Sequence, residues 1–331
     1  MCGIVAVTGY KKALPLLLNG LEKLEYRGYD SAGIAVIESE TKNITCKKAE
    51  GKLRNLISNL NDKNIPGTVG IGHTRWATHG KPEVKNAHPH TDSSGNIAVV
   101  QNGIIENFQD LKNKLEIEGI IFNSDTDTEV IPHLIQRELN TLSKLKLENN
   151  GSTLLVAVRN VISDLEGSYA LAVLWSGAPT SLVVARRQAP LIIGLGEGEF
   201  MCASDTPAIA NFTNIILPLE DEEIALLTPL GIEIYDSNNE RQYRNPVSLK
   251  VSEQIIDKMN FKHFMLKEIY DQPVTAKNWL ENYLIKNSEN GQYQINYSFD
   301  TKFFESIERI DIIACGTSKH AAMVGSFLLE Q

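Results

Sequence analysis

The chain has 331 residues, a length that fits two domains of ordinary size. Hydrophobic residues make up 42% of it and charged residues 22%, proportions that are typical of globular proteins and argue against a disordered or fibrous chain. The formal net charge of −9 argues against nucleic acid as the main partner, because phosphate backbones are bound by basic surfaces.

The four cysteines lie far apart and none belongs to a CxxC pair, which argues against a disulfide framework and favours a reducing compartment. The apolar stretch at 13–21 is too short to span a bilayer and lacks the cleavage site of a signal peptide. We therefore expect a cytoplasmic protein that binds no membrane.

The first part of the chain predicts short strands with helices between them. Residues 2–9 are typical of a buried strand, and leucines at helical spacing predict an amphipathic helix over 12–26. Further strands are expected at 31–39, 43–51, 67–72 and 95–101, and helices at 106–119 and 126–139.

The second part begins with a polar surface connection at 141–152 and a helix at 153–165. Strands rich in β-branched residues follow at 168–175, 180–187, 199–205, 222–228 and 231–236. Since strands and helices do not alternate regularly, the pattern favours an α+β fold with helices covering antiparallel sheets. Central sheet positions are expected for 67–72, 97–101 and 170–175.

A polar, turn-rich stretch at 237–248 predicts a linker. Beyond it, 263–284 is strongly helical, and 309–331 predicts a strand, a Gly-Thr-Ser turn and a helix. The sequence therefore predicts two domains, 1–240 and 241–331.

The second residue, Cys2, is followed by a buried apolar run. A thiol here is either incidental or serves a reaction that needs a thiol and a free α-amine on the same residue. Its position alone does not decide between the two.

The segment HTRWATHG at 73–80 is a candidate anion site. Arg75 offers a planar guanidinium suited to a carboxylate, and Thr78 and His79 add donors. Trp76 is placed to cover a small ligand. A surface ion pair for Arg75 and core packing for Trp76 explain the composition equally well. Four histidines fall within 73–90, but their spacing matches no zinc signature, so we expect no metal.

Two further polar segments have competing interpretations. In QNG at 101–103, Asn-Gly is the commonest hairpin turn, while the alternative is an oxyanion hole made by the Asn102 amide and the Gly103 N–H. The pattern alone favours the turn. In SDTDTEV at 124–130, Asp127 is a helix-capping acid, part of a DxD-type metal–phosphate site, or a carboxylate that receives an ammonium.

Near the end of the printed sequence, ACGTSKH at 314–320 places Thr317 and Ser318 where a strand is expected to lead into a helix. Hydroxyls and backbone N–H groups at a helix N-terminus bind phosphate. An ordinary helix cap explains the same residues.

Taken together, several stretches resemble the class II glutamine amidotransferases, in this order: MCGIVAV, LEYRGYDSAGIAV, IGHTRWATHG, NAHPH, VQNGIIENF, SDTDTEV and LEGSYALAV. LEYRGYDSAG with HTRWATHG is similar to the branch of that family in which a glutaminase is joined to a sugar isomerase. KEIYDQP and ACGTSKH resemble the linker and the start of that isomerase, so the resemblance covers nearly the whole chain.

The resemblance implies an N-terminal nucleophile hydrolase fold, a four-layer α/β/β/α sandwich, followed by a linker and the first strand and helix of an incomplete sugar-isomerase (SIS) domain. It implies that Met1 is removed and that Cys2 attacks the glutamine amide, giving a thioester and ammonia. Asn102 and Gly103 would hold the oxyanion. The α-amine of Cys2, with a pKa of about 7.7–8.0, would act as the base.

The resemblance also assigns the residues that bind L-glutamine. Arg75, Thr78 and His79 would bind its α-carboxylate, and Asp127 its α-ammonium. Trp76 would lie in a loop that closes over the site. Arg27 would help shape the pocket.

In this branch the ammonia passes to the isomerase, where fructose 6-phosphate becomes glucosamine 6-phosphate, and the full-length enzyme is a homodimer without a cofactor. Thr317 and Ser318 match its first sugar-phosphate loop. Because no second such loop, acid–base set or C-terminal tail follows, we expect this chain to lack complete synthase activity. Two alternatives stay open: a stand-alone glutaminase or other amide hydrolase, and a catalytically silent binding module, which would tolerate Cys2→Ala.

Overall fold

The computed structural model describes residues 2–60, 65–77, 79–249, 261–286, 293–295, 301–314 and 316–330. The chain divides into two compact units, Met1–Asp257 and Lys258–Gln331. Each unit is considered by itself.

The first unit contains two sheets, and every strand pairing within them is antiparallel. The first sheet has the strand order β15-β11-β9-β10-β1-β4-β2-β3. Its strands are β1 (Gly3–Thr8), β2 (Ser31–Ile37), β3 (Ile44–Glu50), β4 (Val69–Arg75), β9 (Ile192–Leu195), β10 (Phe200–Ala203), β11 (Ile215–Pro218) and β15 (Val247–Ser248).

The second sheet has the strand order β14-β13-β12-β8-β7-β6-β5. Its strands are β5 (His90–Thr91), β6 (Ile97–Ile105), β7 (Gly167–Trp175), β8 (Leu182–Arg187), β12 (Ile224–Thr228), β13 (Gly231–Tyr235) and β14 (Arg241–Gln242). The interior positions of β4, β6 and β7 confirm the central strands predicted from the sequence.

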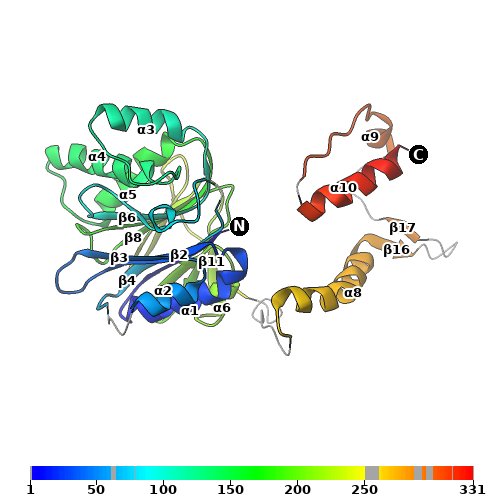
Figure 1. The fold of residues 1–331 in the computed structure, drawn as a ribbon, viewed down its shortest axis with the longest axis horizontal. Coiled ribbons are helices and arrows are strands. Elements are labelled where there is room, and N and C mark those ends of the chain that lie inside the picture. Colours follow the sequence, from blue (N-terminus) through cyan, green and yellow to red (C-terminus); the bar gives the residue numbers. More distant parts are fainter. Residues whose placement is uncertain are drawn as a thin grey trace. The chain divides into compact units, whose positions relative to one another are not determined.

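Helices cover the outer face of each sheet (Figure 1). The first sheet carries α1 (Ala13–Leu24), α2 (Leu53–Leu60) and α6 (Pro207–Ala210), and the second carries α3 (Phe108–Ile117), α4 (Val130–Lys144) and α5 (Gly151–Ser163). Two short 3₁₀ helices lie at Glu25–Arg27 and Val84–Asn86.

The alternation of side chains along β1 explains the layers. Val5 and Val7 pack against α1, while Ile4 and Ala6 belong to a second core that also contains alternate residues of β6 and β7. A third core joins the second sheet to α3, α4 and α5. The first unit is therefore an α/β/β/α sandwich, which confirms the predicted fold class.

One end of the layer between the sheets is polar. Along β4 the side chains facing this layer change from Ile71 to His73 and Arg75, and along β6 they change from Val100 to Asn102. Cys2 continues the same face of β1 beyond Ile4. The fold thus brings polar side chains from both sheets to one place.

The linker predicted at 237–248 is wrong, because this stretch supplies edge strands. β14 pairs with β13, and β15 pairs with β11. Polar side chains are tolerated there since edge strands meet solvent. Both strands lie beyond residue 240, where the sequence predicted the first domain to end.

The helix predicted from residue 126 begins later, because α4 starts at Val130. Its C-terminal end extends into the polar stretch predicted as a connection, since α4 continues to Lys144. Polar residues occur both on the solvent side of a helix and in surface loops, so they do not show where a helix ends.

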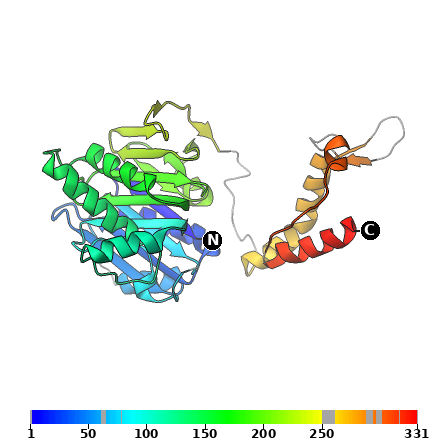
Figure 2. The same ribbon diagram turned by 90° about the horizontal axis from the view of Figure 1, so that it is seen from above.

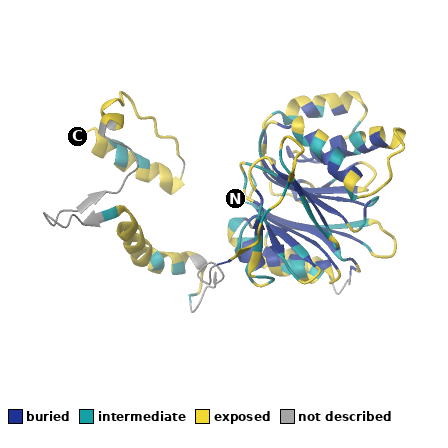
Figure 3. Ribbon diagram, turned by 180° about the vertical axis from the view of Figure 1, so that it is seen from behind, coloured by how far each residue is buried: buried dark blue, intermediate teal, exposed yellow. Residues whose placement is uncertain are grey.

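The second unit contains α8 (Phe264–Tyr283), β16 (Leu284–Lys286), β17 (Tyr293–Ile295), α9 (Thr301–Glu305) and α10 (Gly316–Leu329). Figure 2 shows its helices from above. The two predicted helices are confirmed, but residues 309–314 form no strand. A strand needs a hydrogen-bonding neighbour. Most described side chains of this unit are exposed (Figure 3).

Candidate functional site

Cys2 lies directly before β1, at the polar end of the layer between the sheets. The backbone N–H of Trp76 donates to its Sγ at 3.2 Å, and the thiol lies 3.5 Å from the Trp76 carbonyl oxygen. Burial raises the pKa of the Cys2 thiol, opposed by the Trp76 N–H and the positive charge of Arg75. The thiol therefore needs a nearby base to become a nucleophile at neutral pH.

Arg75 ends β4 and is 3% exposed, so the prediction of a surface ion pair is wrong. Its guanidinium donates to the carbonyl oxygens of His79 and Lys81, the latter at 3.3 Å. Burial lowers the pKa of Arg75, although the neighbouring Cys2, Asp127 and Asp30 oppose this shift. Arg75 thus organises the loop after β4 and brings positive charge close to Cys2.

Trp76 is 44% exposed, which overturns its interpretation as a core residue. Its ring packs edge-on against Tyr29, with centroids 5.6 Å apart. Asp30 accepts a hydrogen bond from the N–H of Ala77 at 2.9 Å, which ties the same loop to the start of β2. Thr78 lies outside the described residues.

The His79 side chain is half-buried and meets Phe108 edge-on, with ring centroids 5.8 Å apart. Its carbonyl oxygen accepts from Arg75. His79 therefore belongs to the loop that borders Cys2 and Arg75.

Asn102 and Gly103 lie inside β6, opposite Ala170 and Tyr169 of β7, so the predicted hairpin turn is wrong. The Asn102 side-chain amide donates to the Cys2 carbonyl oxygen at 3.1 Å. Gly103 has φ 110°, and a Cβ there would lie 2.1 Å from the carbonyl oxygen of Ser168. Only glycine fits this combination of backbone angle and close approach.

Asp127 precedes the first residue of α4 and is not its N-cap, so the capping interpretation is wrong. Its carboxylate accepts the N–H of Ile105, at the end of β6, at 2.8 Å. Burial raises the pKa of Asp127, while the Ile105 N–H, His79 and Arg75 lower it. The carboxylate is thus held near the positive charge of Arg75.

Arg27 forms an ion pair with Asp205 and donates to the Ser204 carbonyl oxygen at 3.5 Å. Ser204 in turn accepts the N–H of Ile4 through its hydroxyl at 3.0 Å. Arg27 therefore acts on the site through the start of β1, where Cys2 is held.

Three of the four clustered histidines come together behind Asn102, while His79 lies apart. His73 stacks on His88 with centroids 4.2 Å apart, and His88 meets His90 edge-on at 4.7 Å. Among the described residues, no group of three His, Cys, Asp or Glu side chains is arranged to hold a metal ion. Motif spacing missed His73 and His88. The alternation of side chains along the strand could have identified His73, because His73 shares the inward face of β4 with Arg75.

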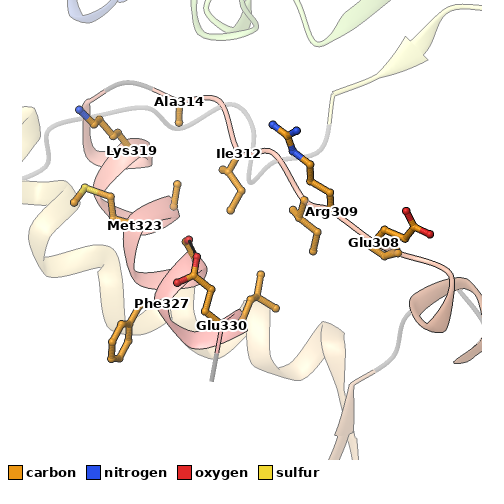
Figure 4. A pocket seen from close by; sticks show the side chains of 13 residues that line it. Glu308, Arg309, Ile312, Ala314, Lys319, Met323, Phe327 and Glu330 are labelled. Atoms are coloured by element: carbon orange, nitrogen blue, oxygen red, sulfur yellow. Dashed lines mark hydrogen bonds between the residues drawn. The ribbon is translucent and has the colours of Figure 1, made fainter.

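Thr317 and Ser318 are exposed in the first turn of α10. A cavity of about 800 Å³ lies beside this helix in the second unit (Figure 4), but neither residue lines it. Its wall combines apolar side chains, among them Ile312, Met323 and Phe327, with the charged side chains of Glu308, Arg309, Lys319 and Glu330. The cavity is therefore not formed by the two residues that the sequence predicted to bind phosphate.

Comparison with known proteins shows what the chain is similar to. Residues 73–211 match the family described as a glutamine amidotransferase domain. A glutamine–fructose-6-phosphate aminotransferase (isomerizing) of Thermosynechococcus vestitus is 50% identical over the whole of this chain and 52% of its own length. One from Methanosarcina acetivorans is 43% identical over the whole chain and 53% of its own length. The chain thus spans about half the length of the curated relatives it matches.

Solved structures give the same assignment of the fold. The glutamine phosphoribosylpyrophosphate amidotransferase of B. subtilis is 29% identical and superimposes with a TM-score of 0.59 over 74% of this chain and 50% of its own. A structure described as the allosteric regulatory enzyme of purine biosynthesis gives 30% identity and a TM-score of 0.60 over the same shares. Among the described residues, every helix is either too short or too polar to span a bilayer.

The arrangement combines a thiol, an amide donor, a cation and a carboxylate in one corner of the sandwich. The amide of Asn102 and the thiol of Cys2 suit attack on a carbonyl carbon that develops a negative oxygen. Arg75 and Asp127 supply opposite charges beside them. A small molecule with both a carboxylate and an ammonium would find a partner for each.

Proposed function

We propose that the chain hydrolyses the side-chain amide of glutamine with Cys2 as the nucleophile, and the match of residues 73–211 to the glutamine amidotransferase domain supports this proposal. The observation that carries the proposal is the hydrogen bond from the Asn102 amide to the backbone carbonyl oxygen of Cys2, which holds an amide donor of one sheet beside the residue of the other sheet that bears the thiol. A thiol and a donor in this relation suit acyl transfer.

Once Met1 is removed, the Cys2 α-amine accepts the thiol proton and Sγ attacks the amide carbon. The Asn102 amide and the Gly103 N–H stabilise the oxygen of the tetrahedral intermediate. The C–N bond then breaks, the amine returns the proton to the leaving nitrogen, and ammonia departs from a thioester. Water, deprotonated by the same amine, hydrolyses the thioester to glutamate and restores the thiol.

Substrate recognition is proposed to use the opposite charges beside Cys2. The α-ammonium of glutamine binds Asp127, and its α-carboxylate binds at Arg75, Thr78 and His79. Trp76, half-exposed on the loop after β4, covers the bound substrate from solvent. The burial of Arg75 and Asp127 supports this role, because both charges act more strongly where water is scarce.

We further propose that the ammonia serves glucosamine 6-phosphate synthesis from fructose 6-phosphate in a cytoplasmic homodimer. Support comes from the names of relatives that match the whole of this chain. The described cysteines Cys2, Cys46 and Cys202 are free, as is usual in a reducing compartment.

The test is glutamine-dependent release of ammonia and glutamate by the purified chain, measured beside Cys2→Ala and Cys2→Ser. We expect both variants to fold and to bind glutamate while turnover is lost. Peptide mapping after treatment with a γ-diazoketone analogue of glutamine should place the adduct on Cys2. Turnover by Cys2→Ala at the wild-type rate would contradict the role of Cys2 as nucleophile. Binding of glutamate without turnover by the wild-type chain would favour a binding module.

A further inference from the structure

Behind the Asn102 amide lies a buried pair of histidines that takes no part in the proposed reaction. His73, on β4, is 1% exposed, and His88, before β5, is 5% exposed. Their rings are stacked with an interplanar angle of 14°. Burying two imidazoles costs free energy unless their polar atoms are satisfied.

The hydrogen bonds of His73 define its tautomer. Its Nε2 lies 3.1 Å from the carbonyl oxygen of Gln101, which only accepts, so Nε2 carries the hydrogen. The buried Nδ1 has no hydrogen-bond partner among the described residues, as fits a bare nitrogen. Burial lowers the pKa of His73 to about 3, so the ring is a neutral donor.

The orientation of the Asn102 amide follows independently. Its Nδ2 donates to the Cys2 carbonyl oxygen, so Oδ1 must point the other way. That Oδ1 lies 3.0 Å from His73 Nε2. The same imidazole N–H therefore reaches the backbone of Gln101 and the side chain of Asn102.

His88 holds the neighbouring residue of β6. The Gln101 N–H donates to His88 Nδ1 at 3.2 Å, so Nε2 carries the hydrogen and points to Thr128 Oγ1 at 3.4 Å. The Thr128 hydroxyl donates to Gln101 Oε1 at 2.8 Å. Gln101 is thus held through its N–H, its carbonyl and its side chain.

We propose that His73 is a positioning residue for glutamine hydrolysis, whose Nε2–H keeps the Asn102 amide turned so that Nδ2 faces the oxyanion. His88 supports it by stacking on its ring and by fixing Gln101. The inference rests on the proposed glutaminase function. Without the imidazole donor the amide rotates, and Oδ1 then repels the negative oxygen that Nδ2 should stabilise.

Three variants test the role. His73→Phe keeps the stacked ring and removes the donor, and we expect kcat to fall ~100-fold, as for loss of an oxyanion donor, with KM within about threefold. His73→Gln returns an N–H at similar reach and should recover at least ~10-fold of that loss. His320→Phe, at an exposed histidine of α10 that has no part in the proposed site, should leave kcat unchanged. Unchanged kcat in His73→Phe would overturn the proposal.

A pair of ligands separates positioning from pocket shape. Glutamate γ-semialdehyde forms a tetrahedral adduct with Cys2 and uses the oxyanion donors, whereas glutamate does not. In His73→Phe we expect the aldehyde to inhibit ~100-fold more weakly while glutamate affinity stays constant. An equal loss for both ligands would contradict the proposal.

Histidine tautomers in the wild-type chain give a measurement that needs no variant to fold. ¹⁵N spectra of chain labelled at histidine should show His73 and His88 neutral with the hydrogen on Nε2 at neutral pH. A charged His73, or one with the hydrogen on Nδ1, contradicts the inference alone. A wild-type chain without glutamine turnover contradicts the proposed function and the inference with it.

Discussion

Asn102 and Gly103 are neighbours in β6 but contribute to the site in different ways. Asn102 offers a side-chain amide whose donor already points at Cys2. Gly103 offers a backbone conformation with φ 110° beside the Ser168 carbonyl oxygen, which leaves no space for a side chain. Replacing the side chain of Asn102 should therefore change the rate of hydrolysis, whereas adding a side chain at Gly103 should lower the stability of the strand.

Replacing Asn102 by Ala removes one of the two proposed oxyanion donors. We expect kcat for glutamine hydrolysis to fall ~10²–10³-fold, because the donor acts on the intermediate more than on bound substrate. KM should change little. Steady-state kinetics check this, and a KM effect larger than the kcat effect would show that Asn102 binds substrate instead.

Gly103→Ala should lower the free energy of unfolding by roughly 2–5 kcal/mol, since strain at positive φ adds to overlap with a backbone oxygen. Gly95→Ala is the matched control, because Gly95 also has positive φ but a Cβ there meets nothing within 4 Å. The control should cost about 1 kcal/mol. Denaturant unfolding of both variants measures the difference. Equal losses of unfolding free energy would show that the close approach to the Ser168 carbonyl oxygen is not the cause.

Protonation of Asp127 should weaken the binding of glutamine at low pH. Burial raises the pKa of this carboxyl, so the ionised form that binds an ammonium is lost at a higher pH than for an ordinary aspartate. KM should therefore rise as pH falls through that pKa. Asp127→Asn should raise KM ~10–100-fold at neutral pH and remove the acid rise.

Asp125→Asn provides the control for that measurement. Asp125 is exposed and pairs with Lys85 at 2.8 Å on the surface. Its variant should keep both KM and its pH dependence. A loss of binding equal to that of Asp127→Asn would mean that the loop as a whole, rather than the buried carboxylate, sets KM.

The residue types and their order along the chain predicted most residues of the candidate site, but they did not identify His73 and His88. The motifs flagged Cys2, Arg75 and Asp127, and the structure brings them to one end of the sandwich. The histidines fell in segments that resemble loops, and their burial depends on a partner sheet far away in sequence. Pairing between β1 and β4 places Ile4 opposite His73, a register that spacing motifs do not encode.

Elements with strong periodicity were predicted well, and elements at the edges were not. α1 and the interior strands have continuous apolar faces that specify their burial. β14 and β15 are two-residue edge strands in a polar stretch, so only the neighbouring strand defines them. The positive φ of Gly103 inside β6 is likewise invisible to a pattern that equates Asn-Gly with a turn.

The loop that carries Asp127 depends on Glu129 at the start of α4. Glu129 accepts the N–H groups of Asn123 and Ser124 at 2.8 and 2.6 Å. Burial raises the pKa of Glu129, but the nearby imidazole of His133, 3.9 Å away, and the hydrogen bonds from Ser124 and Asn123 outweigh it and bring the pKa to about 2. The ionised carboxylate thus stabilises the folded loop.

Glu129→Gln should lower the free energy of unfolding at pH 7 by roughly 2–3 kcal/mol. Because the folded pKa is depressed, this contribution is complete above the unfolded pKa and is lost as pH falls through about 2. The difference between wild type and variant should therefore shrink in acid. The control is Glu118→Gln, at a surface pair with Arg137, which should lower the free energy of unfolding by less than ~1 kcal/mol. A loss of stability in Glu129→Gln that does not change with pH would contradict the account.

At the scale of the whole molecule, the two units differ in how completely they bury their side chains. The first has three apolar cores and the second has α10 without one fully buried residue. Since the chain spans about half the length of its relatives, synthesis of glucosamine 6-phosphate stays a proposal for the whole protein. The first unit alone carries the residues proposed for glutamine hydrolysis.

Sugar phosphate should therefore leave this chain unaffected. Thr317 and Ser318 are exposed and do not line the cavity beside α10. We expect ~5 mM fructose 6-phosphate to shift the Tm by less than about 1 °C, because a ligand stabilises only a fold that binds it. A saturable shift would show a formed sugar-phosphate site in the second unit.

The central claim is that Cys2 acts as nucleophile with its own α-amine as base. The most direct measurement compares glutamine turnover by chain shown by intact mass to begin at Cys2 with turnover by chain that retains a blocked N-terminal extension. The account predicts hydrolysis by the first and none by the second, with equal Tm values. Turnover at the same rate in the extended chain would contradict it.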